Sequence, residues 1–212
     1  MEDHTGSVRE FNLIDGGVAA NNPALIGIGE VTKQITRGNP NFLPIKPMDY
    51  GRFLVISLGT GTAKNEQKYS ALEAAKWGLM SWVTTGGGNP LIDIFSHASA
   101  DMVDLHLSTV FQALHSEQNY LRIQDDTLTG VLSSVDVATE ENLHDLEKIG
   151  ISLLESPVSR VNLNTGVYEP AKPQETNKEA LIRLAKLLSQ EKQTRDARSP
   201  HGAIAMGYRW PK

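Results

Sequence analysis

Short apolar runs alternate with amphipathic stretches along the chain, and these two patterns predict strands and helices in turn. The runs expected to form strands cover residues 11–14, 52–58 and 119–124, and each ends at a turn rich in Gly or Asp. The middle run is almost continuously apolar, which is typical of a strand covered on both faces in a parallel sheet. The chain is therefore predicted to be an α/β protein with helices on both faces of the sheet.

Capping residues and apolar spacing predict the helices. They are expected at residues 23–36, 70–83 and 91–115, after a Thr139 cap, and from Thr176 onward. Two asparagines precede Pro23, and asparagine caps a helix while proline suits the first helical position, where no N–H is needed. Loops are expected at 40–47 and 84–90, and a small hairpin at 160–168.

The spacing of apolar residues also predicts which helical positions are buried. These are Leu25, Ile28 and Ile35 in the first helix, Leu143, Leu146, Ile149 and Leu153 after Thr139, and Leu181, Leu184, Ala185 and Leu188 in the last helix. Glu179 follows Thr176 by three residues, the spacing of a capping box. Trp77 and Trp82 are expected in the core rather than at a lipid interface.

Length and composition fit one sizeable core followed by a tail. The chain has 212 residues, 40% of them hydrophobic, and no apolar stretch long enough to span a membrane. The absence of cysteine excludes disulfides and thiolate metal sites, and the polar first residues do not resemble a signal peptide. We therefore expect a cytoplasmic protein with one domain over residues 1–192 and a polar, flexible tail over 193–212.

Charge is spread unevenly along the chain. The net charge of −5 argues against a general nucleic-acid binder. Residues 171–212 nevertheless hold nine Lys and Arg against four Asp and Glu. Lys178, Arg183, Lys186 and Lys192 could contact anionic lipid head groups at a membrane surface, or they could form an ordinary solvated helix face, and both interpretations stay open.

The most informative turn is Asp15-Gly16-Gly17. It follows a predicted strand, and α/β folds place ligands and reactive groups at the carboxyl ends of their strands. An aspartate at such a place could accept a proton from a nucleophile, and glycine lets the backbone turn sharply. Asp-Gly is also a common structural turn, so these three residues alone leave both interpretations open.

Other candidate sites are weaker. Gly59-Thr60-Gly61 lacks the further glycine and lysine of a phosphate-binding loop and is expected to be a tight turn. His97, His106 and His115 are nine residues apart, which puts successive histidines on opposite faces of a helix, so they cannot share a metal ion. His97 and the nearby Asp101 and Asp104 are expected on a solvated or locally hydrogen-bonded face. No metal or organic cofactor is expected.

Several separate segments, in order, resemble the plant members of the patatin-like lipid acyl hydrolases. They are residues 13–25, 57–61, 77–78, 101–104, 111–115 and 120–126, of which Phe-Gln-Ala-Leu-His and Tyr-Leu-Arg-Ile-Gln-Asp-Asp are the strongest. The resemblance covers about residues 9–192 and the C-terminal half of that family's domain. It implies a three-layer α/β/α fold without its first strands, which would leave an exposed sheet edge and uncovered apolar surface.

The resemblance also implies a chemistry. In that family a serine in a Gly-x-Ser-x-Gly turn attacks a fatty acyl ester, and the aspartate of Asp-Gly-Gly acts directly as its base. By resemblance, Asp15 is this base, and Gly16 and Gly17 shape its turn. No serine in this sequence lies between two glycines four residues apart, so the nucleophile is expected outside the chain.

Two functions therefore remain open from the sequence. The first is half of an acyl hydrolase for phospholipid or galactolipid esters, which would need an N-terminal half or a homologue to supply the serine. The second is a non-catalytic remnant that binds lipid surfaces or a full-length homologue. Either function allows a peripheral position at membranes.

Overall fold

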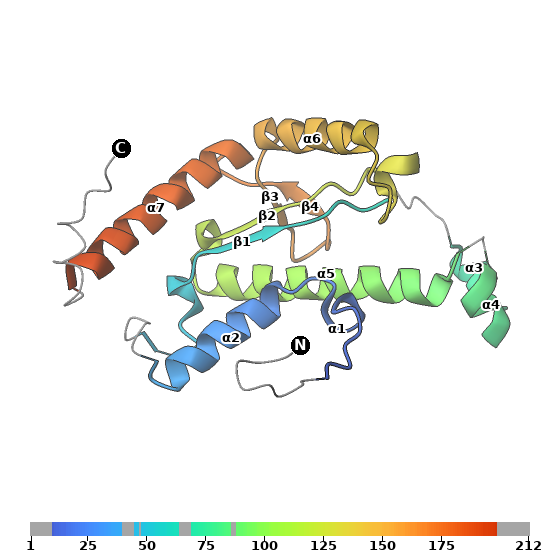
Figure 1. The fold of residues 1–212 in the computed structure, drawn as a ribbon, viewed down its shortest axis with the longest axis horizontal. Coiled ribbons are helices and arrows are strands. Elements are labelled where there is room, and N and C mark those ends of the chain that lie inside the picture. The colour runs from blue at the N-terminus through green and yellow to red at the C-terminus, as the bar shows by residue number, and fades with distance from the viewer. Residues whose placement is uncertain (1–9, 40–44, 47, 64–68, 86–87, 199–212) are drawn as a thin grey trace. The chain divides into compact units, whose positions relative to one another are not determined.

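The computed structural model describes residues 10–39, 45–46, 48–63, 69–85 and 88–198, which form two compact units (Figure 1). The first unit comprises the described parts of residues 1–48 and 66–107, and the second those of 49–65 and 108–212. The boundary falls within one long helix, α5 (Pro90–Ala113). The predicted loops at 40–47 and 84–90 and the end of the predicted tail lie partly or wholly outside the described residues.

The first unit contains α1 (Gly17–Ala20), α2 (Ala24–Thr36), α3 (Ala71–Ala74), α4 (Leu79–Thr84) and most of α5. The predicted helix at 23–36 is confirmed: Ile28 is buried, and Leu25 and Ile35 are half-buried. It ends at Thr36, and Gly38, two residues later, donates its N–H to the Ile35 carbonyl at 3.0 Å with a φ of +67°. Glycine adopts this left-handed conformation without strain, so the chain can leave the helix there.

The predicted buried strand at 11–14 is wrong. These residues have irregular backbone with no strand partner in the described part of the chain. Leu13 and Ile14 are 81% and 82% exposed. A strand is stable only when neighbouring backbone pairs with it and a layer covers it, and the apolar pattern of one run supplies neither.

The predicted helix at 70–83 is also wrong, because α3 and α4 are separated at Trp77 and Gly78. Gly78 is extended, with φ −85° and ψ 177°, and glycine is a poor helix former. Trp77 packs edge-on against Trp82, with ring centroids 5.2 Å apart, and also against Tyr69. Neither tryptophan is buried in the core as expected; both are half-buried in this small aromatic cluster.

The second unit holds the strands of the described chain. β1 (Val55–Leu58) and β2 (Tyr120–Ile123) pair in parallel, with Val55 opposite Tyr120 and Leu58 opposite Ile123. β3 (Ser159–Val161) and β4 (Tyr168–Pro170) form the predicted antiparallel hairpin, which turns at Gly166 with φ +72°. The remaining elements are α6 (Glu140–Glu155), α7 (Asn177–Arg198), and the 3-10 turns η1 (Tyr50–Arg52), η3 (Glu117–Asn119) and η4 (Gly130–Ser133).

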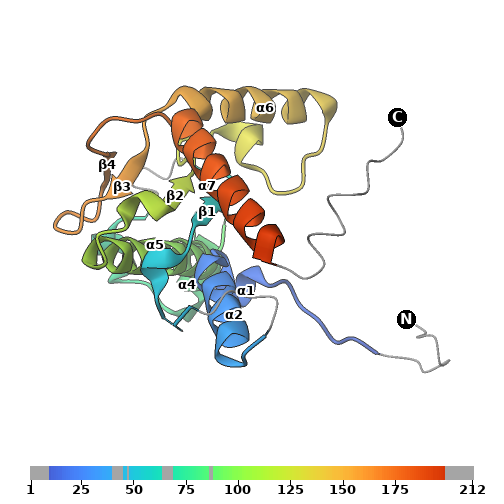
Figure 2. The ribbon, with the colours of Figure 1, turned by 90° about the vertical axis from the view of Figure 1, so that its left-hand side faces the viewer.

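Residues of β2 alternate between two packed layers. Tyr120 stacks on Phe111, in the last turns of α5, with ring centroids 5.5 Å apart. The next residue, Leu121, packs with Val158 and with Ala180 and Leu184 of α7. Successive strand residues point to opposite faces, so the end of α5 and the start of α7 cover opposite sides of β2 (Figures 1 and 2). This arrangement confirms the predicted α/β class with helices on both faces.

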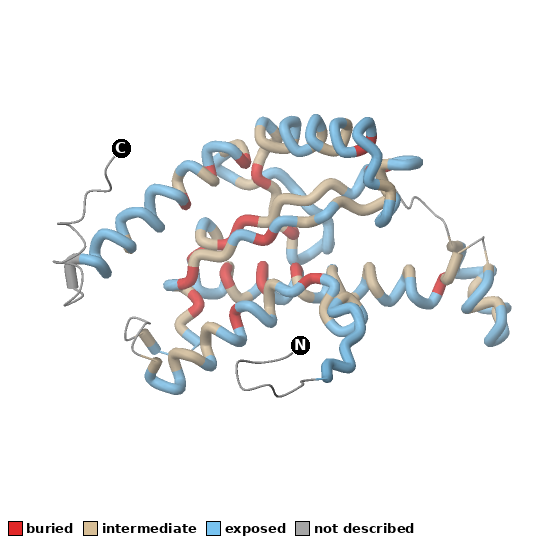
Figure 3. Tube along the Cα trace, viewed as in Figure 1, coloured by how far each residue is buried: buried red, intermediate tan, exposed pale blue. Residues whose placement is uncertain are grey.

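Several predicted buried positions are exposed, as Figure 3 shows for much of α6 and α7. Ile56 and Leu58 of β1 are 39% and 68% exposed, so this strand is not covered on both faces. Leu143 and Leu188 are 54% and 47% exposed, and Ala185 is also exposed. The reason on α7 is length: 22 residues span about 33 Å, well beyond the short strands that cover its first turns. α7 continues to Arg198, so the division at residue 192 stays a prediction.

The predicted helix caps are confirmed. The Thr139 side chain accepts a hydrogen bond from the Asn142 N–H at 3.3 Å. At the start of α7, the Thr176 N–H donates to Glu179 Oε2 at 2.9 Å, and the Glu179 N–H donates to Thr176 Oγ1 at 3.2 Å. The Thr176 N–H, followed by its hydroxyl, lowers the pKa of the Glu179 carboxyl from its ordinary value of 4.5.

This cap predicts a pH-dependent contribution to stability. A folded-state pKa below the unfolded one stabilises the fold above the unfolded value and stops doing so as pH falls through the folded value. Glu179→Gln is therefore expected to lower Tm slightly at neutral pH. Once the pH has fallen well below 4.5, the variant and the unsubstituted chain should have the same Tm. Thermal melts followed by circular dichroism at both pH values test this, and an equal difference at both would contradict it.

Candidate functional site

Asp15 lies in a compact turn at the start of α1. Its Oδ1 accepts a hydrogen bond from the Gly17 N–H at 2.7 Å, and its carbonyl accepts one from the Val18 N–H at 3.3 Å. The residue is exposed, so the carboxylate is held by its own turn while it remains open to solvent. The predicted turn is confirmed, although the strand expected before it is not formed.

The two glycines of this turn have different roles. A Cβ atom at Gly17 would lie 2.9 Å from Asp15 Oδ1 and 3.5 Å from Asn21 Oδ1, so a side chain there would displace the carboxylate. A Cβ at Gly16 would meet nothing within 4 Å, and φ of Gly16 is an ordinary −65°. Only Gly17 is therefore sterically required for the observed position of Asp15.

A buried polar pair follows this turn, and the sequence did not reveal it. The Asn22 side chain donates from Nδ2 to Asp104 Oδ1 of α5 at 2.8 Å, and each residue is only 5% exposed. Asn22 Oδ1 also accepts from the Ala24 N–H at 3.2 Å, but the N-cap of α2 is Pro23 and has no side-chain cap, so the predicted asparagine cap is wrong by one position. Asp104 is thus not on a solvated or locally bonded face as expected, since it contacts a residue 82 positions away. The pair fixes the segment after Asp15 to α5.

The glycines after β1 make room for a side chain of the neighbouring strand. Gln124 donates from Nε2 to Thr62 Oγ1 at 2.5 Å and to Asp126 Oδ1 at 2.9 Å. A Cβ at Gly59 would overlap Oε1 of Gln124. Gly61 has φ +84°, a conformation that favours glycine. These contacts confirm the expected tight turn.

The histidines do not form a site. His97 and His106 lie on α5, whereas His115 follows the helix with φ of +50°, so the predicted helix ends two residues early, at Ala113. Among the residues that the structure describes, no group of three or more His, Asp or Glu side chains is arranged to hold a metal ion.

Two of the four basic residues considered for lipid contact are engaged within the protein. Lys178 Nζ lies 3.1 Å from Glu155 Oε1. Arg183 holds Glu175 with two hydrogen bonds of 3.0 and 3.1 Å and donates to the Gln118 carbonyl at 3.0 Å. In the described part of the chain, none of the helices combines the length and apolar character needed to cross a membrane.

Comparison with known proteins gives one consistent group of relatives. The chain is 61% identical to Patatin-like protein 2 of Arabidopsis thaliana over 201 residues, which are 95% of this chain and 49% of that protein. It is 56% identical to Patatin-like protein 3 of the same plant, with 94% and 46% covered. It is 40% identical to Patatin-14 of Solanum tuberosum, with 92% and 47% covered. No family model matches the chain.

These matches extend over more than nine tenths of the chain, at identities that chance does not produce. The chain spans about half the length of the curated relatives it matches. With the parallel pairing of β1 and β2 and the helices on both faces of β2, the similarity establishes that the chain belongs to the patatin-like proteins.

Proposed function

We propose that this chain contributes the proton-accepting half of a lipid acyl hydrolase active site, with Asp15 as the base. The patatin-like relatives support the hydrolase class. The observation that carries the assignment to Asp15 is its geometry: the carboxylate is held by the Gly17 N–H at 2.7 Å and is exposed. A restrained and accessible carboxylate can take a proton from a hydroxyl group brought against it.

The proposed reaction has two steps. A serine Oγ adds to the ester carbonyl while Asp15 takes the hydroxyl proton, and the C–O bond to the alcohol then breaks. Asp15 returns the proton to the departing alcohol, which leaves an acyl-serine. Water, deprotonated by the same carboxylate, then releases the fatty acid and restores the serine. The substrate class is a fatty acyl ester of a membrane lipid.

The serine is proposed to come from another segment of a patatin-like chain or from a homologue. No serine in this sequence occupies a Gly-x-Ser-x-Gly turn. Leu13 and Ile14 in the first unit, and Ile56 and Leu58 in the second, are exposed apolar residues. Exposed apolar residues are typical of sites where another protein segment binds, so each pair is suited to burial by additional protein.

The proposal predicts that the 212-residue chain alone does not hydrolyse a p-nitrophenyl fatty acyl ester above background. Aspartate can orient water, but it cannot replace the nucleophile that forms the acyl intermediate. Supplying the upstream half of a patatin-like relative in the same polypeptide is expected to restore turnover. Activity of the chain alone that disappears in Asp15→Ala would contradict this division of the site.

A non-catalytic role at lipid surfaces is the second candidate, favoured by the excess of basic residues in residues 171–212. Lys186 and Lys192 are exposed on α7. If they contact anionic lipid, the fraction of the chain that sediments with anionic vesicles falls as salt rises past about 0.15 M, where the screening length is about 8 Å. Equal binding to neutral and anionic vesicles would leave these lysines as a solvated helix face.

A further inference from the structure

We propose that Asn22 and Asp104 are positioning residues, whose buried hydrogen bond holds the turn that carries Asp15 in place on α5. The inference rests on the proposed role of Asp15 as the base, and it adds the contact that keeps this base in its reactive position. Both residues belong to the first unit. Asn22 lies between α1 and α2, and Asp104 lies in the second half of α5.

The segment around Asp15 is attached to its unit at few points. None of residues 10–21 is buried, and Leu13 and Ile14, directly before the turn, are almost fully exposed. α1 has no buried residue either. Asn22 is the first buried residue after Asp15. In the described part of the chain, Asn22 is therefore the nearest buried residue to which the Asp15 turn is connected.

A short hydrogen-bonded unit connects Asp15 to Asn22. The Asp15 carboxylate accepts from the Gly17 N–H at 2.7 Å. The Gly16 carbonyl accepts two backbone hydrogen bonds within α1, of 3.1 and 2.9 Å. Asn21, which ends α1, keeps helical dihedral angles, with φ −60° and ψ −37°. Because successive residues of this unit are held together, a displacement of Asn22 moves the Asp15 carboxylate with it.

The bond between Asn22 and Asp104 is suited to hold this unit in place. Asn22 Nδ2 donates to Asp104 Oδ1 at 2.8 Å, and each residue is 5% exposed. A hydrogen bond to a carboxylate is about twice as strong as one between neutral groups, and burial removes competition from water. The Ala24 N–H donates to Asn22 Oδ1 at 3.2 Å, so both ends of the amide are held. α5, a helix of 24 residues, supplies a rigid support.

Placement is important for a general base because proton transfer needs close contact. The base must lie within about 2.6–3.2 Å of the atom that gives up its proton. A displacement of about 1 Å, caused by a substitution outside the reacting groups, can lower the rate about a hundredfold. The pair is therefore expected to act on kcat through Asp15, while binding of the lipid ester changes little.

Asn22→Ser separates the two hydrogen bonds of this side chain. A serine hydroxyl can still accept from the Ala24 N–H, as hydroxyls do in comparable turns, but it is too short to reach Asp104. In the 212-residue chain, the Gly17 amide proton, which is bonded to Asp15, is expected to exchange with solvent roughly five to ten times faster in this variant. NMR of the ¹⁵N-labelled chain measures this hydrogen exchange and requires no hydrolysis.

Turnover provides the second readout. In a protein completed by the upstream half of a patatin-like relative, Asn22→Ser is expected to lower kcat by a factor on the order of 10–10² and to leave KM nearly unchanged. Asn22→Asp places two carboxylates in contact and should lower kcat as well. Adding Asp104→Asn restores one amide and one carboxylate with their roles reversed. This double variant should have a kcat at least about tenfold above that of Asn22→Asp alone.

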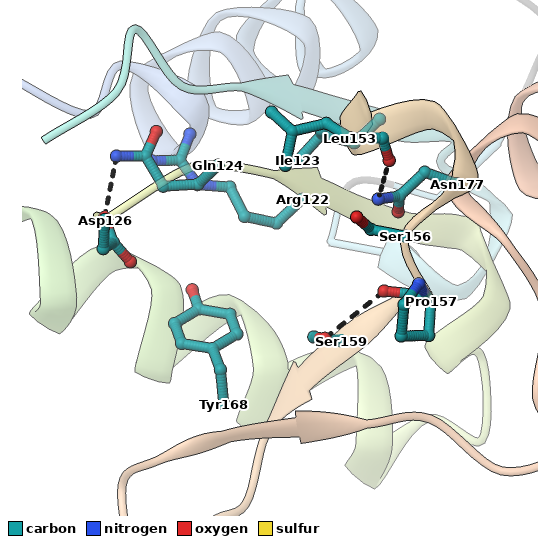
Figure 4. A pocket seen from close by; sticks show the side chains of 10 residues that line it. All are labelled: Arg122, Ile123, Gln124, Asp126, Leu153, Ser156, Pro157, Ser159, Tyr168 and Asn177. Atoms are coloured by element: carbon teal, nitrogen blue, oxygen red, sulfur yellow. Dashed lines mark hydrogen bonds between the residues drawn. The ribbon is translucent and has the colours of Figure 1, made fainter. Parts of the chain in front are cut away.

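Asn177→Ser is the matched control. Asn177 lies beside an open pocket in the second unit, where it is also 5% exposed and donates from Nδ2 to the Leu153 carbonyl at 2.8 Å (Figure 4). The same substitution thus removes a bond of the same length at the same burial. It should lower Tm about as much as Asn22→Ser does, while kcat and the hydrogen exchange of Gly17 stay unchanged.

Unchanged hydrogen exchange at Gly17 in Asn22→Ser, or equal effects in Asn177→Ser, would overturn the proposal. Faster exchange at Gly17 with an unchanged kcat would overturn the positioning role as well, because the turn would be held without consequence for the reaction. If the completed protein has no activity that depends on Asp15, it is the proposed function that fails. The hydrogen exchange of Gly17 then still decides whether the pair holds this turn.

Discussion

Asp15→Asn is expected to lower kcat by a factor on the order of 10²–10⁴ in an active site completed by an upstream patatin-like half. The amide keeps the shape of the carboxylate and can still accept the Gly17 hydrogen bond of 2.7 Å, but it cannot take a proton from the serine. KM for the lipid ester should change little, because the carboxylate acts on the nucleophile rather than on the acyl chain. Initial rates on a fatty acyl ester measure both constants.

Asp136→Asn provides the control for a lost surface carboxylate. Asp136 is exposed, and its Oδ1 accepts a hydrogen bond from the nearby Ser134 hydroxyl at 3.0 Å. Its kcat should equal that of the unsubstituted protein. A near-normal kcat in Asp15→Asn, with the circular dichroism spectrum unchanged, would remove Asp15 from the mechanism and reduce Asp15-Gly16-Gly17 to a structural turn.

The largest expected effect on stability is that of Leu184→Ala, about 2–5 kcal/mol of unfolding free energy. Leu184 is fully buried, at 0% exposed, and packs with Leu121, Val158 and Ala180 between α7 and β2. Removing its side chain loses apolar burial and leaves a cavity that the surrounding strands and helix cannot fully close. Urea unfolding followed by circular dichroism measures the change.

Leu188→Ala is the matched control, one turn further along the same helix. Leu188 is 47% exposed, so its truncation should cost well under about 1 kcal/mol. Both variants should keep the same dependence of unfolding free energy on urea concentration, since neither alters the surface exposed on unfolding much. Equal losses in the two variants would mean that α7 is buried along its length, contrary to the structure.

The sequence by itself determined the features that depend on neighbouring residues. The capping box of Thr176 and Glu179, the Thr139 cap and the turn at Gly166 were predicted and are present, because each is closed by contacts within a few residues. The Asp15 turn belongs to this class, since its hydrogen bond reaches only to Gly17. The family resemblance was likewise visible in the sequence.

Only the tertiary structure decided which of the predicted faces are buried. Residues 11–14 and Ile56 have the apolar pattern of covered strands, but burial depends on partners that the pattern of one segment does not specify. The apolar spacing predicts burial for both Leu184 and Leu188, but only Leu184 is buried. Leu188 lies one turn further along α7, beyond the strands that cover the start of this helix. The pair of Asn22 and Asp104 joins residues 82 positions apart, and the open pocket beside Asn177 is lined by separate elements. Such contacts arise only when the folded chain brings distant segments together, so no local pattern encodes them.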